Sequence, residues 1–485
     1  MTDETATAQR LVRRFARETN LLVSGRDFTV EGTDAVAEAL RVLLHALGGH
    51  LRAGGAGQTG VVFAPGEAVE ILLDGAPLPV RETAEDRVDA AGRHMPVATA
   101  LAARLRDAGT VRGMRIGIAM VLEPKTAQLA LLLRDAGATV AVYAHPDEID
   151  VEVAGVLRAR GIPVDGDPTL SGAAERAAAV SFLRRGFDLL LDDGSHLIRL
   201  AHEEGIAADL RGAAEETTSG LTPLRLMERE GVLGIPVIAV NDALTKTSFD
   251  NRYGTGQSCV FAIADALDAA GIDVRDQPAV VIGYGPVGEG VAAHLRALGV
   301  DVAVTETDAV RALRAAHDGY RIGRLRDLAP GALVVSATGA PHTVDAEVLR
   351  VARIVAVAGG VPHEIDLDVS TVHPYAGERG ETSPFVERAG DGALVIARGG
   401  CVNLSAGEGN PIEIMDLSFS VQLFAVEHLL THDLSVGVHP LPAEADATIG
   451  AAALAARGEQ IDERSPAQVE AQREWRSPRF RGASA

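Results

Sequence analysis

The sequence predicts an α/β protein made of two doubly wound parallel-sheet domains with an extra N-terminal module. Three observations predict this class. The chain of 485 residues is longer than one hydrophobic core usually organises. Its apolar fraction is 47% with only 4% aromatic residues, which favours helices packed on parallel strands. Short apolar segments alternate with helical patterns, as in repeated βαβ units.

Charge and cysteine content narrow the expected partners. The formal net charge of −22 disfavours nucleic acid and anionic membranes, so a small molecule is the expected ligand. Two cysteines are too few for a disulfide framework, and no apolar run approaches the length of a membrane span. The first residues lack the apolar core of a signal peptide. We therefore expect a cytoplasmic protein, and we predict no metal site.

Residues 1–83 are predicted to form an accessory module. A helical pattern in GTDAVAEALRVLLHALGGHL has Thr33 or Asp34 as its N-cap and two glycines at its end. The segments GVVFAPG and EAVEILLDG alternate about a Pro-Gly turn, which predicts a hairpin. No motif in this module indicates a function.

Residues 84–247 are predicted to form the first parallel-sheet domain, because strand and helix patterns repeat along this range. Ligands of such sheets bind beyond the carboxyl ends of the strands. Several of the predicted strands end in acids or amides, and convergence of such groups is the usual sign of an active site. The residues concerned are Glu123, Asp192, Asp193, Asn241 and Asp242.

Residues 248–410 are predicted to form a dinucleotide-binding domain. The segment VVIGYGPVGEG joins a strand to a helix through three spaced glycines. Gly283 would make the tight turn, Gly285 would let the backbone approach a pyrophosphate, and Gly288 would allow close packing of helix on strand. A second strand follows and ends at Glu306. These features together predict a bound dinucleotide.

The acid at the end of the second strand selects the cofactor. The carboxylate of Glu306 would accept hydrogen bonds from ribose hydroxyls and repel a 2′-phosphate, which favours NAD over NADP. Thr307 and Asp308 offer no compensating cation. Val287 in the glycine loop and Thr338 at a later strand end are the other residues expected to contact NAD in this domain.

Only two of the 45 basic residues are lysines, Lys125 and Lys246. Arginine keeps its charge above pH ~12, whereas a lysine of reference pKa ~10.4 can be shifted toward neutrality by burial. Lys246 has Asp250 and Asn251 close by in the sequence. It is therefore a candidate for proton transfer, and a polar surface position is the alternative interpretation.

The chain resembles the S-adenosylhomocysteine hydrolase family over roughly residues 84–480. The resemblance is carried, in the family's order and spacing, by LLLDDG, EETTSG, VNDALTKTSFDNRYG, VVIGYGPVGEG, VTETD and CVNLSAGEGNPIEIMDLSFSVQ. It implies that residues 84–247 are a substrate domain and residues 248–410 a Rossmann NAD domain. It also implies that residues 411–455 return to the substrate domain and that 456–485 form a tail. In that family NAD oxidises the 3′ hydroxyl of a nucleoside, which acidifies the 4′ hydrogen and allows the 5′ substituent to leave.

The resemblance implies a catalytic set of five residues. Lys246 and Asp250 would lie at the 3′ hydroxyl, where a lysine of lowered pKa would take the proton. Asn251 would contact ribose and nicotinamide, and Glu216 would hold the ribose hydroxyls. Asp193 would lie near the 4′ and 5′ carbons. The implied NAD contacts outside the glycine loop are Thr217, Thr218, Ser219, Asn251 and Asn403.

Three histidines of the family are replaced, by Val121, Gly360 and Asn410. In the family they assist departure of the leaving group, addition of water and recognition of adenine, so these steps are expected to differ. His363 could substitute in part. His196 could supply a new acid, although a surface position is its alternative interpretation.

Charged residues are added where the resemblance places the nucleoside base. Glu123 and Lys125 replace a threonine and a glutamate of the family, and Glu408 replaces a methionine. Unpaired charge beside adenine and a thioether is costly, so we expect a more hydrophilic substrate. Pairing of Glu123 with Lys125 in solvent is the alternative. The expected substrate-binding residues are Glu123, Lys125, Thr126, Glu216, Lys246, Asp250, Glu408 and Asn410.

The segment WRSPRFR near the C-terminus resembles a family tail whose lysine and tyrosine reach NAD in a neighbouring subunit. Arg476 and Phe480 take those two positions, so a homodimer or homotetramer is expected. The preferred function is a nucleoside 5′-dehydratase that yields a 4′,5′-unsaturated nucleoside. The alternatives are hydrolysis of S-adenosylhomocysteine or an analogue, and an NAD-binding regulator without turnover.

Overall fold

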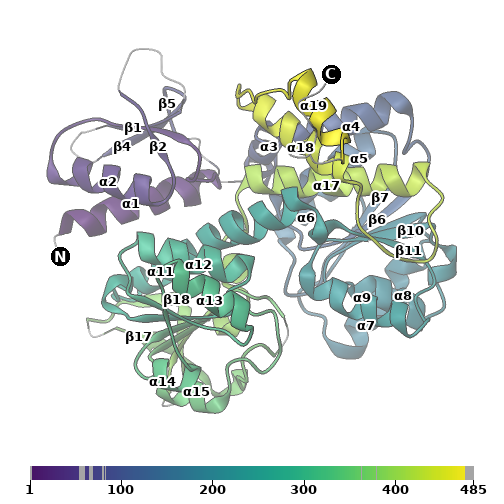
Figure 1. The fold of residues 1–485 in the computed structure, drawn as a ribbon. Coiled ribbons are helices and arrows are strands. Elements are labelled where there is room, and N and C mark those ends of the chain that lie inside the picture. The colour runs from purple at the N-terminus through teal and green to yellow at the C-terminus, as the bar shows by residue number, and fades with distance from the viewer. Residues whose placement is uncertain are drawn as a thin grey trace.

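A computed structural model describes residues 3–53, 60–64, 69–78, 81, 83–361, 363–377, 379–390 and 392–475. The described strands form three sheets of five, seven and eight strands, and Figure 1 shows each sheet with helices packed against it. The two larger sheets are mostly parallel, which confirms the predicted α/β class. Among the described helices, none is both long and apolar enough to cross a bilayer.

The N-terminal sheet has the order β2-β1-β3-β4-β5. The predicted helix is α2, and the Asp34 side chain caps it by accepting a hydrogen bond from the Ala37 backbone N–H at 2.8 Å. Strands β3 and β4 pair antiparallel as expected, although residues 65–68 between them lie outside the described residues. The elements are α1 (Asp3–Thr19), β1 (Asp27–Val30), α2 (Ala35–Ala46), β2 (His50–Leu51), β3 (Val61–Ala64), β4 (Glu70–Leu73) and β5 (Ala76–Pro77).

This module is attached to the dinucleotide-binding domain by buried polar contacts. Arg13 of α1 is almost fully buried, and its guanidinium lies 2.7 Å from Asp265 and also pairs with Asp268. The side chain of Gln257 accepts a hydrogen bond from the Val23 N–H and donates one to the Leu21 carbonyl. A buried ion pair of this kind fixes the position of α1 against its neighbour.

The seven-stranded sheet is parallel throughout, with the order β20-β11-β10-β9-β6-β7-β8. The chain winds outward in both directions from β6 and β9, so the switch point lies between these strands, where ligands bind in such sheets. The strands are β6 (Arg115–Ala119), β7 (Thr139–Tyr143), β8 (Val164–Asp165), β9 (Leu189–Asp192), β10 (Gly212–Glu215), β11 (Pro236–Ala239) and β20 (Gly437–His439).

Helices cover both faces of this sheet (Figure 1). Strand β20 and the long helix α17 come from the end of the chain, so the chain returns here after building the other large sheet. The helices are α3 (Ala84–Arg93), α4 (Pro96–Ala108), α5 (Pro124–Asp135), α6 (Val151–Ala159), α7 (Gly172–Leu183), α8 (His196–Glu203), η1 (Ala207–Asp209), α9 (Thr218–Arg229), η2 (Val240–Asp242), α17 (Ile412–Thr431) and α18 (Ala443–Ala456).

The eight-stranded sheet has the order β14-β13-β12-β15-β16-β19-β18-β17, and its last two pairings are antiparallel. Its strands are β12 (Ala279–Ile282), β13 (Val302–Thr305), β14 (Arg321–Ile322), β15 (Leu333–Ser336), β16 (Ile354–Val357), β17 (Val372–Ala376), β18 (Thr382–Ala389) and β19 (Leu394–Ile396). Its helices are α11 (Thr255–Ala269), η4 (Val274–Asp276), α12 (Pro286–Ala297), α13 (Ala309–His317), α14 (Leu325–Leu328), α15 (Ala346–Val351), η5 (Val369–Thr371), η6 (Ala397–Gly399) and α16 (Val402–Ser405).

The two large units are joined through α10 (Leu244–Lys246) and the π-helical segment η3 (Thr247–Gly254). Here α12 approaches so closely that a Cβ on Gly290 would collide with the Arg252 carbonyl oxygen and lie 3.1 Å from the Cα of Gly256 in α11. Glycine is therefore needed at this crossing, and the crossing sets the position of the residues just before Arg252.

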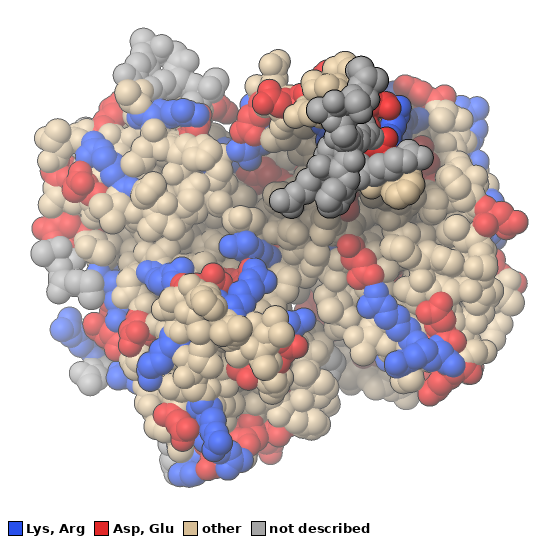
Figure 2. Space-filling view, viewed as in Figure 1, with Lys and Arg blue, Asp and Glu red and all other residues tan. Residues whose placement is uncertain are grey.

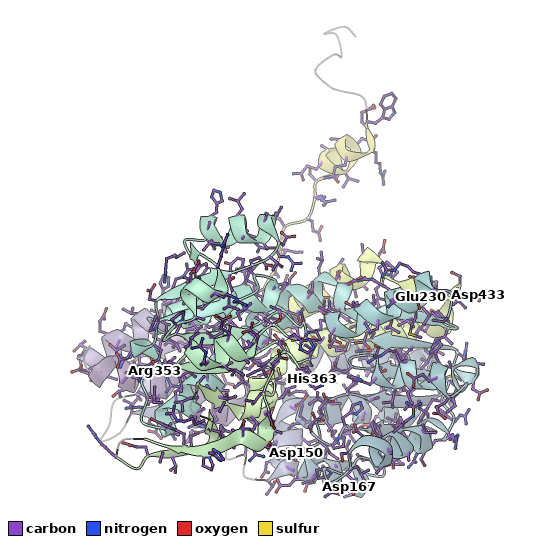
Figure 3. The ribbon with its side chains drawn as sticks, turned by 90° about the horizontal axis from the view of Figure 1, so that it is seen from below. Asp150, Asp167, Glu230, Arg353, His363 and Asp433 are labelled. Atoms are coloured by element: carbon purple, nitrogen blue, oxygen red, sulfur yellow. The ribbon has the colours of Figure 1, made fainter. Side chains whose placement is uncertain are left out.

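Two further features of the fold are the distribution of charge on its surface and the position of its last helix. On the face that Figure 2 displays, acidic and basic side chains are interspersed and form no continuous basic surface. Helix α19 (Pro466–Arg473) has no buried residue, and Figure 3 shows it extending away from the rest of the molecule. Arg476 and Phe480 lie outside the described residues.

Gly290→Ala should destabilise the protein by about 1–3 kcal/mol, because the added methyl group has no space against Arg252 and Gly256. Gly155→Ala is the matched control, since Gly155 lies in a helix with nothing within 4 Å of the new Cβ, and it should stabilise by up to about 1 kcal/mol. Thermal unfolding measures both. Equal unfolding midpoints for the two variants would contradict the close approach of α12 to Arg252 and Gly256.

Candidate functional site

One buried lysine lies among three oxygen-bearing side chains where the two large units meet. Lys246 Nζ is 3.2 Å from Asp250 Oδ2, 3.9 Å from Glu216 Oε1 and 3.1 Å from Asn251 Oδ1. Lys246, Glu216 and Asp250 are each at most 5% exposed. Four of the five residues expected to be catalytic therefore form one buried cluster, and the surface interpretation of Lys246 is wrong.

Side chains from the end of the chain hold this cluster in place. The amide of Asn410 donates to Asp250 Oδ1, and the hydroxyl of Ser418 in α17 donates to Asp250 Oδ2 at 2.8 Å. Gln422, one turn further along α17, donates to Glu216 Oε2 at 2.6 Å. Ser418 and Gln422 are absent from the predicted site. Both lie in the segment CVNLSAGEGNPIEIMDLSFSVQ that carries the resemblance, and their polarity in this helix is the signal that could have found them.

Asn410 has a different environment from the one expected for a substrate contact. Besides Asp250, its amide donates to the Thr255 hydroxyl at 3.1 Å, and its carbonyl accepts from Ser258 at 2.9 Å and from Asn403 at 3.0 Å. All its polar capacity is thus engaged by the protein. Asn410 therefore orients Asp250, and Asn403 in turn holds Asn410 in place.

The pKa of Lys246 is raised, so the expected lowering is wrong for this arrangement of charges. Burial by itself would lower the pKa, but the carboxylates of Asp250 and Glu216 outweigh burial, with Asp193 adding to their effect. Lys246 therefore holds its proton in this structure.

Glu216 is the carboxyl group most affected by this environment. Burial raises its pKa to about 8, against the opposing effect of the Lys246 charge. Its Oε1 atom is buried and has no hydrogen-bond partner in the protein. A buried polar atom without a partner is costly, so this oxygen is suited to a hydroxyl group of a bound ligand.

A second group of acids lies at the end of β9. Burial raises the pKa of Asp192 to about 8 and also raises that of Asp193, with Asp250 contributing to the latter. Glu215 accepts hydrogen bonds from the backbone N–H groups of Gly194 and Ser195 at 2.9 and 2.8 Å, which fixes the turn that follows Asp193. The charge of Lys246 lowers the pKa of Asp193, the fifth expected catalytic residue, against the larger effect of burial, so Asp193 lies within electrostatic reach of the cluster.

The glycine loop fits a dinucleotide. Gly283 has φ +91, and a Cβ on Gly288 would collide with the Gly283 carbonyl oxygen, so both positions require glycine. Gly285 begins α12 without any side-chain cap, which leaves the N–H groups of the first turn, including that of Val287, for a pyrophosphate. The loop therefore has the geometry that the spacing predicts.

The remaining expected NAD contacts come from several elements. Glu306 accepts from the N–H groups of Tyr284 and Asp308 at 2.7 and 3.0 Å, and such bonds lower its pKa despite partial burial. It is thus an ionised acceptor beside the glycine loop. Thr217 is the N-cap of α9, which begins with Thr218 and Ser219. Thr338 is exposed just beyond β15.

The charged residues expected at the base end also lie together. Lys125 is fully buried, and its Nζ lies 2.7 Å from Glu123 Oε2 and 2.5 Å from the Glu408 carbonyl oxygen. Thr126 donates its backbone N–H to Glu123 at 3.2 Å. The pairing of Glu123 with Lys125 is confirmed, but it is not in solvent. Burial raises the pKa of Glu123 although the Lys125 charge opposes this.

Arg81 links the N-terminal module to this end of the site and was not predicted. Its guanidinium, with 6% exposure, pairs with the carboxylate of Glu408, which also lies 3.8 Å from Arg87. The Arg81 Nε atom is buried without a hydrogen-bond partner. The N-terminal module thus supplies a positive charge to the end of the site where the nucleoside base is expected. No motif in the sequence of the module indicated this.

The two histidines considered as substitutes differ in environment. His363 is exposed, and its ring stacks on that of His342. His196 is partly buried against His145, and burial together with the nearby charges of His145 and Arg199 lowers its pKa to about 4. A surface position is therefore wrong for His196. Among the described residues, no group of acids, histidines and cysteines is arranged to hold a metal ion.

Comparison with known proteins decides the family. Residues 251–409 match the family described as "S-adenosyl-L-homocysteine hydrolase, NAD binding domain". The chain is 36% identical over 400 residues to the adenosylhomocysteinase of Archaeoglobus fulgidus, covering 80% of this chain and 98% of that protein. The chain belongs to the adenosylhomocysteinase family. The resemblance seen in the sequence is confirmed.

Other family members match over the same extent. The adenosylhomocysteinase of Thermotoga maritima is 35% identical, with 81% of this chain and 99% of that protein covered. The S-inosyl-L-homocysteine hydrolase of Methanopyrus kandleri is 34% identical, with 80% and 94% covered. Like its adenosylhomocysteinase relatives, this protein is an NAD-dependent enzyme, so both the predicted cofactor and the predicted enzymatic nature are confirmed.

Glu216→Gln should make the stability of the protein depend less on pH. The folded pKa of Glu216, about 8, lies above its unfolded value of ~4.3, so its carboxyl group costs stability progressively as pH rises from about 5 to 8. Removing it should reduce that fall by at most about 1.4 kcal/mol per pH unit, the value for one proton.

Thermal midpoints between pH 5 and 8 measure this effect. The control is Glu203→Gln, at an exposed carboxylate paired with Arg176, which should follow the wild-type slope. A slope for Glu216→Gln equal to that of the wild type would show that this carboxyl group is not the buried acid described above.

Proposed function

We propose that the enzyme oxidises the 3′ carbon of a nucleoside, removes its 4′ proton and expels its 5′ substituent, and that its main reaction is loss of the 5′ hydroxyl as water. The observation that carries the proposal is the buried cluster of Lys246 with Asp250, Asn251 and Glu216. Asp193, which follows β9, lies within electrostatic reach of that cluster.

NAD, when bound, accepts the hydride from the 3′ carbon. Lys246 passes its own proton to Asp250, whose Oδ2 lies 3.2 Å from the Lys246 Nζ, and takes the proton of the 3′ hydroxyl. Asn251 holds Lys246 from one side, and the unpartnered Oε1 of Glu216 binds a ribose hydroxyl. Each residue is fixed by neighbours in η3, α17 or the loop that holds Asn410, so the ribose meets a preorganised site.

Removal of the 4′ proton is assigned to Asp193, directly or through water. Burial and the nearby Asp250 raise the pKa of Asp193, which makes its carboxylate a stronger base than an exposed aspartate. The electron pair left at the 4′ carbon forms the 4′,5′ double bond as the 5′ substituent leaves. The product, once the 3′ ketone is reduced, would be a 4′,5′-unsaturated nucleoside.

The base end of the site supports a hydrophilic substrate. Lys125 replaces a glutamate of the family and is fully buried, with its ammonium bonded to Glu123 and to the Glu408 carbonyl oxygen. Charged groups therefore lie behind this end of the site, which favours a base more polar than adenine. The relative in Methanopyrus kandleri, named for an inosyl substrate, is consistent with such a base.

Hydrolysis of S-adenosylhomocysteine or an analogue is the second candidate. It is favoured by the names of the relatives, most of which are adenosylhomocysteinases. Dehydration is preferred because the family positions that assist water addition and thiol departure carry Val121, Gly360 and Asn410, none of which can transfer a proton. A regulator without turnover would have no use for a buried lysine and acid cluster of this geometry.

The holoenzyme should convert adenosine or inosine to a product lighter by one water, detected by mass spectrometry. S-adenosylhomocysteine and S-inosylhomocysteine, assayed for free thiol, test the hydrolase alternative. Lys246→Arg should abolish reduction of bound NAD, followed by absorbance at 340 nm, while NAD stays bound, because a guanidinium cannot give up its proton. Thiol release without dehydration would replace the first candidate by the second, and turnover unaffected in Lys246→Arg would remove both.

We also propose that the enzyme assembles from at least two copies. The described part of the C-terminal segment supports this, because α19 has no buried residue and extends away from the rest of the molecule (Figure 3). Trp475, which follows α19, is 83% exposed. Such a segment is suited to packing on another copy. Light scattering should give at least twice the chain mass of 50.5 kDa, and truncation after residue 458 should weaken the assembly. A monomeric holoenzyme would contradict the proposal.

A further inference from the structure

A histidine that takes no part in the steps above lies at the end of β7. The Nδ1 atom of His145 is 2.9 Å from Glu175 Oε1 in α7, so the ring donates its Nδ1–H to a carboxylate. Its Nε2 atom is buried and has no hydrogen-bond partner in the protein. A carboxylate that fixes one ring nitrogen while the other is left free is the arrangement used for proton transfer by histidine.

The topology places His145 and Asp193 at the same edge of the sheet, at the ends of two strands that flank β6. Strand β6 lies between β7 and β9, and Tyr143, Ala119 and Asp192 are in register across the three strands. The ring of His145 meets that of His196 edge to face, with centroids 5.0 Å apart. The ring of His196 in turn covers Gly194, because a Cβ there would lie 2.7 Å from the His196 Nε2 atom.

Electrostatics agree with this placement. The charge of His145 lowers the pKa of Asp193 against the larger effect of burial, so the two side chains interact. His196 is unsuited to donate a proton near neutral pH, because burial lowers its pKa to about 4. The family's nearest histidine position, on the extension of β6, carries Val121. Of the two histidines at this edge, His145 is the one with a carboxylate partner.

We propose that His145, oriented by Glu175, is the general acid that protonates the 5′ leaving group. This rests on the proposed function. In the 3′-keto nucleoside the 4′ C–H bond breaks and its proton goes to Asp193. Its electron pair becomes the 4′,5′ double bond as the 5′ C–O bond breaks. The departing oxygen takes the Nε2 proton of His145 and leaves as water, and transfer of the proton from Asp193 restores His145.

One other acid competes for this role. Glu148 follows in the same loop, and burial together with Asp193 and Asp147 raises its pKa well above the usual value, so it also carries a proton. Tyr143 under the His145 ring is held neutral, because burial and the charge of Glu175 raise its pKa to about 12. The test of His145 therefore has to include variants of Glu148 as well.

The test compares leaving groups that differ in their need for a proton. Hydroxide leaves only with an acid, whereas chloride leaves without one. In the holoenzyme, His145→Gln should slow elimination from the adenosine or inosine that the wild type accepts by roughly 10²–10³-fold, the usual contribution of a general acid. Elimination of chloride from the matching 5′-chloro-5′-deoxynucleoside should change by less than about threefold. His50→Gln, an exposed control in the N-terminal module, should change neither rate.

Other outcomes are equally informative. Equal losses for both leaving groups in His145→Gln would show a structural role, and a leaving-group split seen only in Glu148→Gln would assign the acid to Glu148. Either result overturns the proposal. Failure of both nucleosides to reduce the bound NAD in the wild type would instead refute the proposed function.

A second measurement needs no substrate. Nitrogen-15 NMR of the histidine rings, recorded at alkaline pH, should show hydrogen on Nδ1 of His145 and a free lone pair on Nε2, with the signals assigned by their loss in His145→Gln. Glu175→Gln should disturb this tautomer. It should also slow loss of the 5′ hydroxyl more than loss of chloride, although by less than His145→Gln does. The opposite tautomer in the wild type would overturn the proposal whether or not a substrate is known.

Discussion

Burial of one ammonium among carboxylates is the constraint on which the rest of the site depends. Lys246, Asp250 and Glu216 are removed from water together, and a buried charge is tolerated only when it is paired and hydrogen-bonded. The pairing requires polar groups from distant parts of the chain, namely Ser418 and Gln422 in α17. The return of the chain to the first sheet after the dinucleotide-binding domain is therefore part of the site and not only of the fold.

The same constraint explains why the family histidine near the end of that domain can be lost. Asn410 uses both its donors and its acceptor within the protein, so it serves Asp250 instead of the substrate. The proton transfers then fall to other groups. Charges have also gathered at the base end, where Lys125 is buried between Glu123 and the Glu408 backbone and Arg81 reaches in from the N-terminal module.

Much of the fold could be predicted from local signals. The α/β class, the helix capped by Asp34 and the glycine loop at Gly283 follow from spacing and backbone preference, which act over a few residues. Helix α1 was not predicted. It is held against α11 by the buried Arg13, and the partners of Arg13 lie about 250 residues further along the chain. Contacts of that range leave no local pattern.

The sequence by itself determined which chemical groups are available and in what order they occur. It was enough to predict NAD as the cofactor and to single out Lys246 as a candidate for proton transfer. The tertiary structure decided how that chemistry is used. The pKa of Lys246 rises instead of falling because three carboxylates face it, which depends on their mutual distances. His145 gains a free, buried nitrogen only because α7 brings Glu175 to its other side. Residue identity is written along the chain, whereas proton affinity is set by neighbours in space.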